Sequence, residues 1–222
     1  MASEHQPKTA HFIFGRFNPV TIGHREIFEI IAKEAKAEKD KGIDARAFVF
    51  VSNKVNANNP LPVEKKIEYI EQEHGDLGIS FVHTYTNIPQ AIHYLQGEGY
   101  THMTMYVGSD YNSSHFKWVT EKRPFVTIKI TKRGNKNGVI KTSATKSRNA
   151  ARRGNVKTLM EQTGFSKTKA LSLIRDIKAA NKQGFPSQYS KAQASKKSKN
   201  AQASKKPYSK KGGKRTTRKS KK

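Results

Sequence analysis

Apolar residues in the first 130 positions alternate between short continuous runs and longer stretches with helical spacing. The runs cover Phe12–Phe14, Ala45–Val51, Ile79–Thr84, Met103–Val107 and Phe125–Ile130, and we interpret them as buried strands. Segments of helical length separate them. This alternation predicts an α/β fold with a five-stranded parallel sheet, helices on both faces and right-handed crossover connections.

Three helices are expected between these strands from their caps and apolar faces. The first runs from about 23 to 40. The second begins near Pro62, a residue favoured in a first helical turn, and places Ile67 and Ile70 on its inner side. The third runs from about 89 to 95 and ends at a glycine-rich turn.

The pattern changes after the fifth strand. Residues 133–138 are rich in glycine and asparagine and predict a turn. Two further helices are expected at about 143–153 and 166–181. The second of them carries an apolar stripe of Ala170, Leu171, Leu173, Ile174 and Ile177. Beyond Gly184 the periodicity ends.

Charge divides the chain more sharply than hydropathy does. Residues 1–130 carry equal numbers of acidic and basic side chains, so residues 131–222 account for the entire formal net charge of +26. Residues 186–222 contain 14 Lys and Arg and no acid, and repeat one motif at 191–197 and 200–206. We expect a disordered basic tail that binds nucleic acid through its phosphates, the alternative being a solubilising extension.

Composition also excludes several classes of protein. The absence of cysteine rules out disulfides and thiolate metal sites, and agrees with an intracellular protein. The apolar runs are too short to span a bilayer, and the N-terminus lacks the layout of a signal peptide. The histidines show no metal-ligand spacing, so no protein-held metal site is expected.

The decapeptide 15–24, GRFNPVTIGH, joins the first strand directly to the first helix. Gly15 and Gly23 permit close approach of the backbone to a ligand. His24 falls in the first helical turn, where unpaired N–H groups and the helix dipole favour an anion. The junction therefore predicts a phosphate-binding turn, the alternative being a turn that only connects strand to helix.

This decapeptide resembles the Gly-x-Phe-x-Pro-x-(His/Thr)-x-Gly-His signature of the nucleotidyltransferase superfamily, which has a Rossmann-like fold. Thr21 stands in place of the first histidine, as in phosphopantetheine adenylyltransferases. An arginine directly after the first glycine, as in Gly15-Arg16, resembles the sequence of some nicotinamide-mononucleotide adenylyltransferases. The resemblance implies catalytic roles for Thr21 and His24. It implies nucleotide-binding roles for Gly15, Arg16, Phe17 and Gly23.

A second segment, 141–148, is similar to the Ile-Ser-x-Thr-x-x-Arg motif of the same superfamily, although the apolar residue before Ser143 is missing. Ser143 is a good helix N-cap, so its hydroxyl, Thr145 and the free N–H groups can face phosphate oxygens. Arg148 adds a forked cationic donor, and the resemblance makes it catalytic. The alternative is an ordinary serine-capped basic helix.

Smaller matches lie between the two motifs. Lys54 and Lys66 resemble residues that hold the acceptor phosphate, and either is equally interpretable as a solvated lysine. Gly108 and Asp110 resemble a Gly-x-Asp motif that contacts the nucleotide sugar. The alternative is that Asp110 only caps the next helix.

The resemblance implies transfer of an adenylyl or cytidylyl group from ATP or CTP, with Mg²⁺, to a small phosphorylated acceptor with release of pyrophosphate. His24 would donate to the α-phosphate, Thr21 would position the attacked phosphate, and the 143–148 segment would hold the β- and γ-phosphates. Acceptor, base preference and oligomeric state are left open.

Residues 10–165 look most like phage-encoded nucleotidyltransferases. The expected organisation is a flexible N-terminus at 1–9, a nucleotidyltransferase-like domain at 10–165, a basic helix at 166–185 and a disordered tail at 186–222. A second hypothesis is a nucleic-acid-binding protein with secondary activity, located inside a phage virion. A third is an RNA-associated protein with a coincidental motif. The protein is accordingly expected in the cytoplasm, on nucleic acid or in a virion.

Overall fold

The computed structural model describes residues 7–83, 85–109, 113–131 and 142–183. The predicted turn at 133–138, Asp110 and the predicted disordered tail at 186–222 lie outside these residues. None of the helices in the described part combines the length and the apolar character that a membrane span requires.

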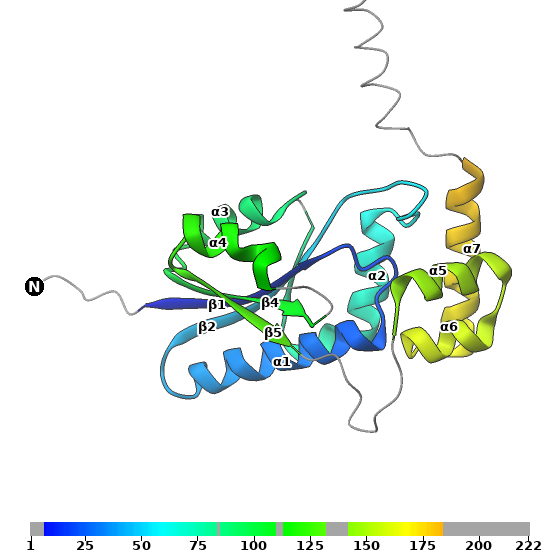
Figure 1. Ribbon diagram of the computed structural model, residues 1–222. Coiled ribbons are helices and arrows are strands. Elements are labelled where there is room, and N and C mark those ends of the chain that lie inside the picture. The colour runs from blue at the N-terminus through cyan, green and yellow to red at the C-terminus, as the bar shows by residue number, and fades with distance from the viewer. Residues whose placement is uncertain (1–6, 84, 110–112, 132–141, 184–222) are drawn as a thin grey trace, which may run out of the picture. The chain divides into compact units, whose positions relative to one another are not determined.

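Five parallel strands form one sheet in the order β3-β2-β1-β4-β5 (Figure 1). They are β1 (Lys8–Gly15), β2 (Asp44–Val51), β3 (Ser80–Val82), β4 (His102–Gly108) and β5 (Val126–Thr131). This confirms the predicted five-stranded parallel sheet. From β1 the chain adds β2 and then β3 on one side of the sheet. It then adds β4 and β5 on the other side of β1. The sheet therefore changes direction between β1 and β4, and such a switch point is where open α/β sheets bind ligands.

Helices cover both faces of the sheet (Figure 1), as predicted. They are α1 (Ile22–Lys39), α2 (Val63–His74), α3 (Ile88–Gly97) and α4 (Lys117–Lys122), with short 3₁₀ turns at Gly75–Leu77 and Ser113–Phe116. Neighbouring residues of β1 serve opposite faces: Phe12 packs in the core beside α3, and Ile13 packs in the core beside α1. Burial on both faces explains why each strand is a continuous apolar run.

Three helices follow β5: α5 (Ala144–Arg153), α6 (Val156–Thr163) and α7 (Lys167–Gln183). The sequence predicted α5 and α7 but not α6, a helix of eight residues that ends at Gly164. The buried side of α7 belongs to the same apolar cluster as α1 and α2.

The predicted apolar stripe of α7 was wrong at one position. Ala170, Leu173, Ile174 and Ile177 are buried, but Leu171 is 43% exposed. Leu171 lies about 100° around the helix from Ala170, which turns its side chain away from the core. The exposed side of α7 therefore contains one leucine among polar residues.

Candidate functional site

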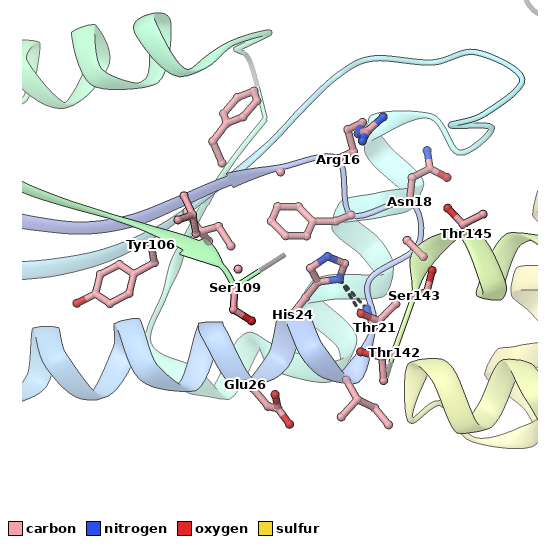
Figure 2. Close-up of a pocket in the computed structure, with 18 of the residues that line it drawn as sticks. Arg16, Asn18, Thr21, His24, Glu26, Tyr106, Ser109, Thr142, Ser143 and Thr145 are labelled. Carbon is pink, nitrogen blue, oxygen red and sulfur yellow. Dashed lines mark hydrogen bonds between the residues drawn. The ribbon is translucent and has the colours of Figure 1, made fainter. Parts of the chain in front are cut away.

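An open cavity of about 1010 Å³ lies at the carboxyl ends of β1 and β4, the switch point of the sheet (Figure 2). It brings together nine of the residues singled out from the sequence: Gly15, Arg16, Phe17, Thr21, His24, Gly108, Ser143, Thr145 and Arg148. The two motif segments, distant in the sequence, thus line one cavity.

The turn after β1 is shaped by the packing of Phe17. Phe17 has a left-handed backbone conformation, with φ 41°, and its ring folds back over Gly15. A Cβ atom at Gly15 would lie 2.6 Å from Cζ of Phe17, so the turn requires glycine there. The space that the missing side chain leaves is filled by the Phe17 ring. That ring also packs edge-on against the His24 imidazole, with centroids 5.0 Å apart.

The start of α1 fixes the orientation of His24. Thr21 is the N-cap residue, and its backbone N–H donates a hydrogen bond to Nδ1 of His24 over 3.0 Å (Figure 2). The hydroxyl of Thr21 lies 3.0 Å from the same nitrogen. Because a backbone N–H can only donate, Nδ1 acts as acceptor and the neutral ring carries its proton on Nε2. His24 is thus prepared as a donor through Nε2.

Arg148 connects the two motif segments directly. Its Nη1 donates to the backbone oxygen of Asn18 over 2.7 Å, and its Nη2 donates to Oγ1 of Thr145 over 3.0 Å. Asn18 in turn bonds with its side chain to both the N–H and the carbonyl of Leu61, ahead of α2. Asn18 is therefore a structural link that the motif comparison did not single out.

A second connection runs through the start of α5. The N–H of Gly23 donates to Oγ1 of Thr142 over 3.1 Å, and the N–H of Ser143 donates to Oε1 of Gln162 over 2.8 Å. Ser143 caps α5, its side chain accepting from the N–H of Lys146. Gln162 is buried on α6. Sequence reasoning missed Gln162 because α6 itself was not predicted, and no local motif marks the residue.

The electrostatic character of the cavity is cationic. Arg16, Lys146 and Arg148 line it together with one carboxylate, Glu26, and within the described residues none of the three cations lies at ion-pair distance from a carboxylate. Partial burial lowers the pKa of the Arg148 guanidinium from its ordinary value, and the positive charges of Arg152 and Arg16 lower it further. Unpaired cations held together in this way form a site for an anion.

The two lysines proposed for acceptor binding are not part of the cavity lining. Lys66 is 1% exposed, and its Nζ donates to the backbone oxygens of Ser52, over 2.6 Å, and Lys54, over 3.1 Å. Burial lowers the pKa of Lys66 to about 8. The Lys54 side chain is exposed on the loop that Lys66 anchors. Gly23 does not line the cavity, but its N–H donates to Thr142, which does.

Metal-ligating clusters give no further candidate in the described part of the chain. No group of three or more His, Asp or Glu there has an arrangement suited to a metal ion. The hydroxyl-bearing residues Ser143 and Thr145 line the same cavity as the cationic side chains, and Oγ1 of Thr145 accepts from Arg148.

Comparison with known proteins identifies the fold. No family model and no curated protein matches the chain. Among solved structures, Plasmodium falciparum nicotinic acid mononucleotide adenylyltransferase complexed with NaAD matches with a TM-score of 0.50 at 9% identity, over 78% of this chain and 98% of that chain. Its complex with APC matches with a TM-score of 0.49 at 10% identity, over the same shares. The first likeness shows the fold alone, a Rossmann-like α/β arrangement as expected from the sequence.

Proposed function

We propose that this protein is a nucleotidyltransferase, which transfers an adenylyl or cytidylyl group from a nucleoside triphosphate to a phosphorylated acceptor. The observation that carries the proposal is the hydrogen bond from Arg148 to the backbone of Asn18, 130 residues away, which brings the second motif onto the phosphate-binding turn. His24 and Arg148 thereby face one cationic cavity at the switch point of the sheet. A triphosphate is the ligand that suits such a cavity.

The chemistry is an in-line displacement at the α-phosphorus. An oxygen of the acceptor forms a bond to that phosphorus while the bond to the bridging oxygen of pyrophosphate breaks. Nε2–H of His24 donates to an α-phosphate oxygen, and Thr21 orients the ring and the attacked phosphate. Catalysis consists of alignment and of neutralising the charge that develops on the phosphorus.

The remaining site residues bind the nucleotide. Ser143, Thr145 and Arg148 hold the β- and γ-phosphates, assisted by the N-terminus of α5. Gly15, Arg16, Phe17 and Gly23 shape the phosphate turn, and Gly108 and Asp110, two positions apart in the sequence, contact the nucleotide sugar.

Mg²⁺ would enter with the triphosphate and neutralise part of its charge. Phosphate oxygens and water supply most ligands of such an ion, and the hydroxyls of Ser143 and Thr145 are hard oxygen donors that suit it.

The acceptor side is the less constrained half of the site. Lys54 is exposed and able to hold an acceptor phosphate, whereas Nζ of Lys66 is already engaged by two carbonyls. We therefore assign Lys66 to holding the loop on which Lys54 lies.

The test is transfer of label from an α-phosphorus-labelled ATP or CTP, with Mg²⁺, to a panel of phosphorylated acceptors that includes nicotinate mononucleotide and phosphopantetheine. Loss of a charge-assisted hydrogen bond by Arg148→Ala should reduce kcat/KM by about 10- to 100-fold. Arg46→Ala removes an equal charge near the start of β2, at the amino end of the strand and away from the cavity, and should change little. Absence of transfer to every acceptor, together with absence of triphosphate binding, would overturn the proposal.

Nucleic-acid binding is a second candidate function, favoured by the 14 Lys and Arg of residues 186–222. In this alternative the transfer reaction is secondary and the protein packs with nucleic acid, as inside a phage particle. Deletion of residues 186–222 should weaken binding to nucleic acid and flatten its dependence on salt, since fewer counterions are released. Unchanged binding after the deletion would reject this function for the tail.

A further inference from the structure

The solvent-facing side of α7 carries a row of four basic residues and one leucine. It consists of Lys167, Leu171, Arg175, Lys178 and Lys182, all exposed. Their spacing of three or four positions places them along one side of the helix, away from the buried Leu173 and Ile177. We call these five residues the basic stripe.

In the part of the chain that the structure describes, the cations of the basic stripe have no acidic partner. Some exposed cations on other helices have an acidic partner one turn away, as in the pairs Lys36–Asp40 and Lys117–Glu121. Within the described residues, no carboxylate lies at ion-pair distance from the four cations of the stripe. Asp176, the only acid of α7, instead accepts a hydrogen bond from the hydroxyl of Tyr69.

Like charges at this spacing destabilise an isolated helix, so the stripe has a cost in stability. A solvated surface usually mixes both signs of charge. The row of one sign therefore points to an anionic partner that offsets the repulsion when bound.

The basic surface continues from α7 onto α5. Nζ of Lys178 lies beside Gly154, where a Cβ atom would be 3.5 Å away, and Gly154 ends α5. The last turn of α5 exposes Arg152 and Arg153. Cations of two helices thus adjoin, outside the cavity proposed to bind the triphosphate.

We propose that the basic stripe is a docking surface for the phosphate backbone of duplex nucleic acid. From Lys167 to Lys182 the helix rises about 22 Å, at 1.5 Å per residue. One strand of a duplex presents a phosphate about every 3.4 Å of its axis, so several phosphates lie within reach of four cations. Lysine and arginine without aromatic neighbours provide backbone contacts and no base reading, so binding is independent of sequence.

The composition of the stripe favours nucleic acid over a membrane surface. Helices that lie on bilayers oppose a basic face with a broad apolar one. Leu171 is the one large apolar residue that α7 exposes, and the rest of its apolar side is buried in the core.

The test compares two full-length variants that lose the same four charges. The stripe variant is Lys167→Gln, Arg175→Gln, Lys178→Gln and Lys182→Gln. The control is Lys33→Gln, Lys39→Gln, Lys41→Gln and Lys122→Gln, at exposed positions without an ion pair among the described residues. Glutamine forms helix as well as lysine and arginine do, so α7 should persist. Circular dichroism and thermal unfolding of each variant check this.

Binding to a labelled DNA duplex is measured by fluorescence anisotropy between about 50 and 200 mM salt. For the stripe variant, the slope of log K against log salt should decrease in magnitude by up to about 3.6, since each of four lost phosphate contacts contributes about 0.9. Affinity at about 100 mM salt should fall at least tenfold, by the same relation, and the control should keep nearly the wild-type slope. Equal slopes in both variants would overturn the proposal, because a general charge effect then explains the loss.

Two further measurements separate the remaining outcomes. Stripe-dependent binding to vesicles rich in phosphatidylserine, without stripe-dependent binding to duplex DNA or RNA, would assign the surface to membranes and overturn the proposal. Nucleotidyl transfer should be equal in the stripe variant and the wild type, because the stripe lies outside the cavity. A negative result for nucleotidyl transfer and a negative result for nucleic-acid docking can therefore be told apart.

Discussion

The backbone N–H of Thr21 donates a hydrogen bond to Nδ1 of His24, over 3.0 Å. A residue that caps the helix thereby sets the protonation pattern of a residue in its first turn. Because Nδ1 accepts, the ring presents its proton on Nε2, where a phosphate oxygen can receive a hydrogen bond. The same contact fixes the ring against Phe17, so the donor is oriented before any ligand arrives.

Replacing His24 by an amide side chain should separate its acceptor role at Nδ1 from its donor role at Nε2. Asparagine can accept from the Thr21 N–H but has no donor as far out as Nε2, whereas the amide nitrogen of glutamine extends about as far. We expect His24→Asn to lower kcat by about 10²- to 10³-fold, the usual cost of one lost donor, and His24→Gln to lower it less. Pyrophosphate release and thermal unfolding, measured on both variants, check this. Equal loss in both would contradict a donor role for Nε2.

Gly15→Ala should destabilise the protein because the new methyl group collides with the Phe17 ring, at 2.6 Å. Overpacking of this kind costs about 1–3 kcal/mol in the free energy of unfolding. Gly97→Ala, at the end of α3, is a matched control whose Cβ meets no atom within 4 Å, and it should be neutral or slightly stabilising. Denaturant unfolding measures both. If combining Gly15→Ala with Phe17→Leu costs as much as the two changes added together, the collision is not the cause.

Gln162→Leu should weaken the binding of the triphosphate although Gln162 lies outside the cavity lining. The change removes the acceptor for the Ser143 N–H, so the start of α5 loses its anchor on α6. An unpaired polar group of this kind costs about 1–3 kcal/mol. We expect KM for the triphosphate to rise more than kcat falls. Gln72→Leu, on the exposed side of α2, is the matched control. A variant with lowered stability and unchanged KM would show that Gln162 has no positioning role.

The strands and the phosphate turn were predictable because their signals are local. A strand buried on both faces is an apolar run in any context, and Thr21 and His24 are neighbours in the sequence. The helix α6 was not predicted because eight residues give too few turns for a period to emerge, even though Asn155 caps it and Gly164 ends it.

The contacts that complete the site depend on tertiary structure. A lysine in a polar segment gives no sign that it is buried, yet Lys66 is held by two carbonyls of a loop 12 to 14 residues earlier. Leu171 was placed in the core because its neighbours belong there, and only the direction of packing shows it to be exposed. The position of Gly15 suggested room for a ligand, and the structure fills that room with Phe17.

Lys66 should make the stability of the protein depend on pH. Burial lowers the pKa of Lys66 from its ordinary value of 10.5 to about 8, whereas the unfolded chain keeps the ordinary value. Between these two pH values the unfolded state binds more protons, so the free energy of unfolding rises as the pH increases from about 8 to 10.5. Below this window the full penalty of burying the ammonium applies.

Lys66→Met removes this titration. As the pH increases from about 8 to 10.5, the wild type should therefore gain up to about 3 kcal/mol in free energy of unfolding relative to the variant. Urea unfolding at both ends of the window measures it. Lys65→Met is the control, since the exposed ammonium of Lys65 pairs with Glu68, which raises its pKa and gives no gain in stability over this range. A difference for Lys66→Met that stays constant with pH would mean that Lys66 titrates in the folded protein as it does in the unfolded chain, its two carbonyl partners compensating for burial.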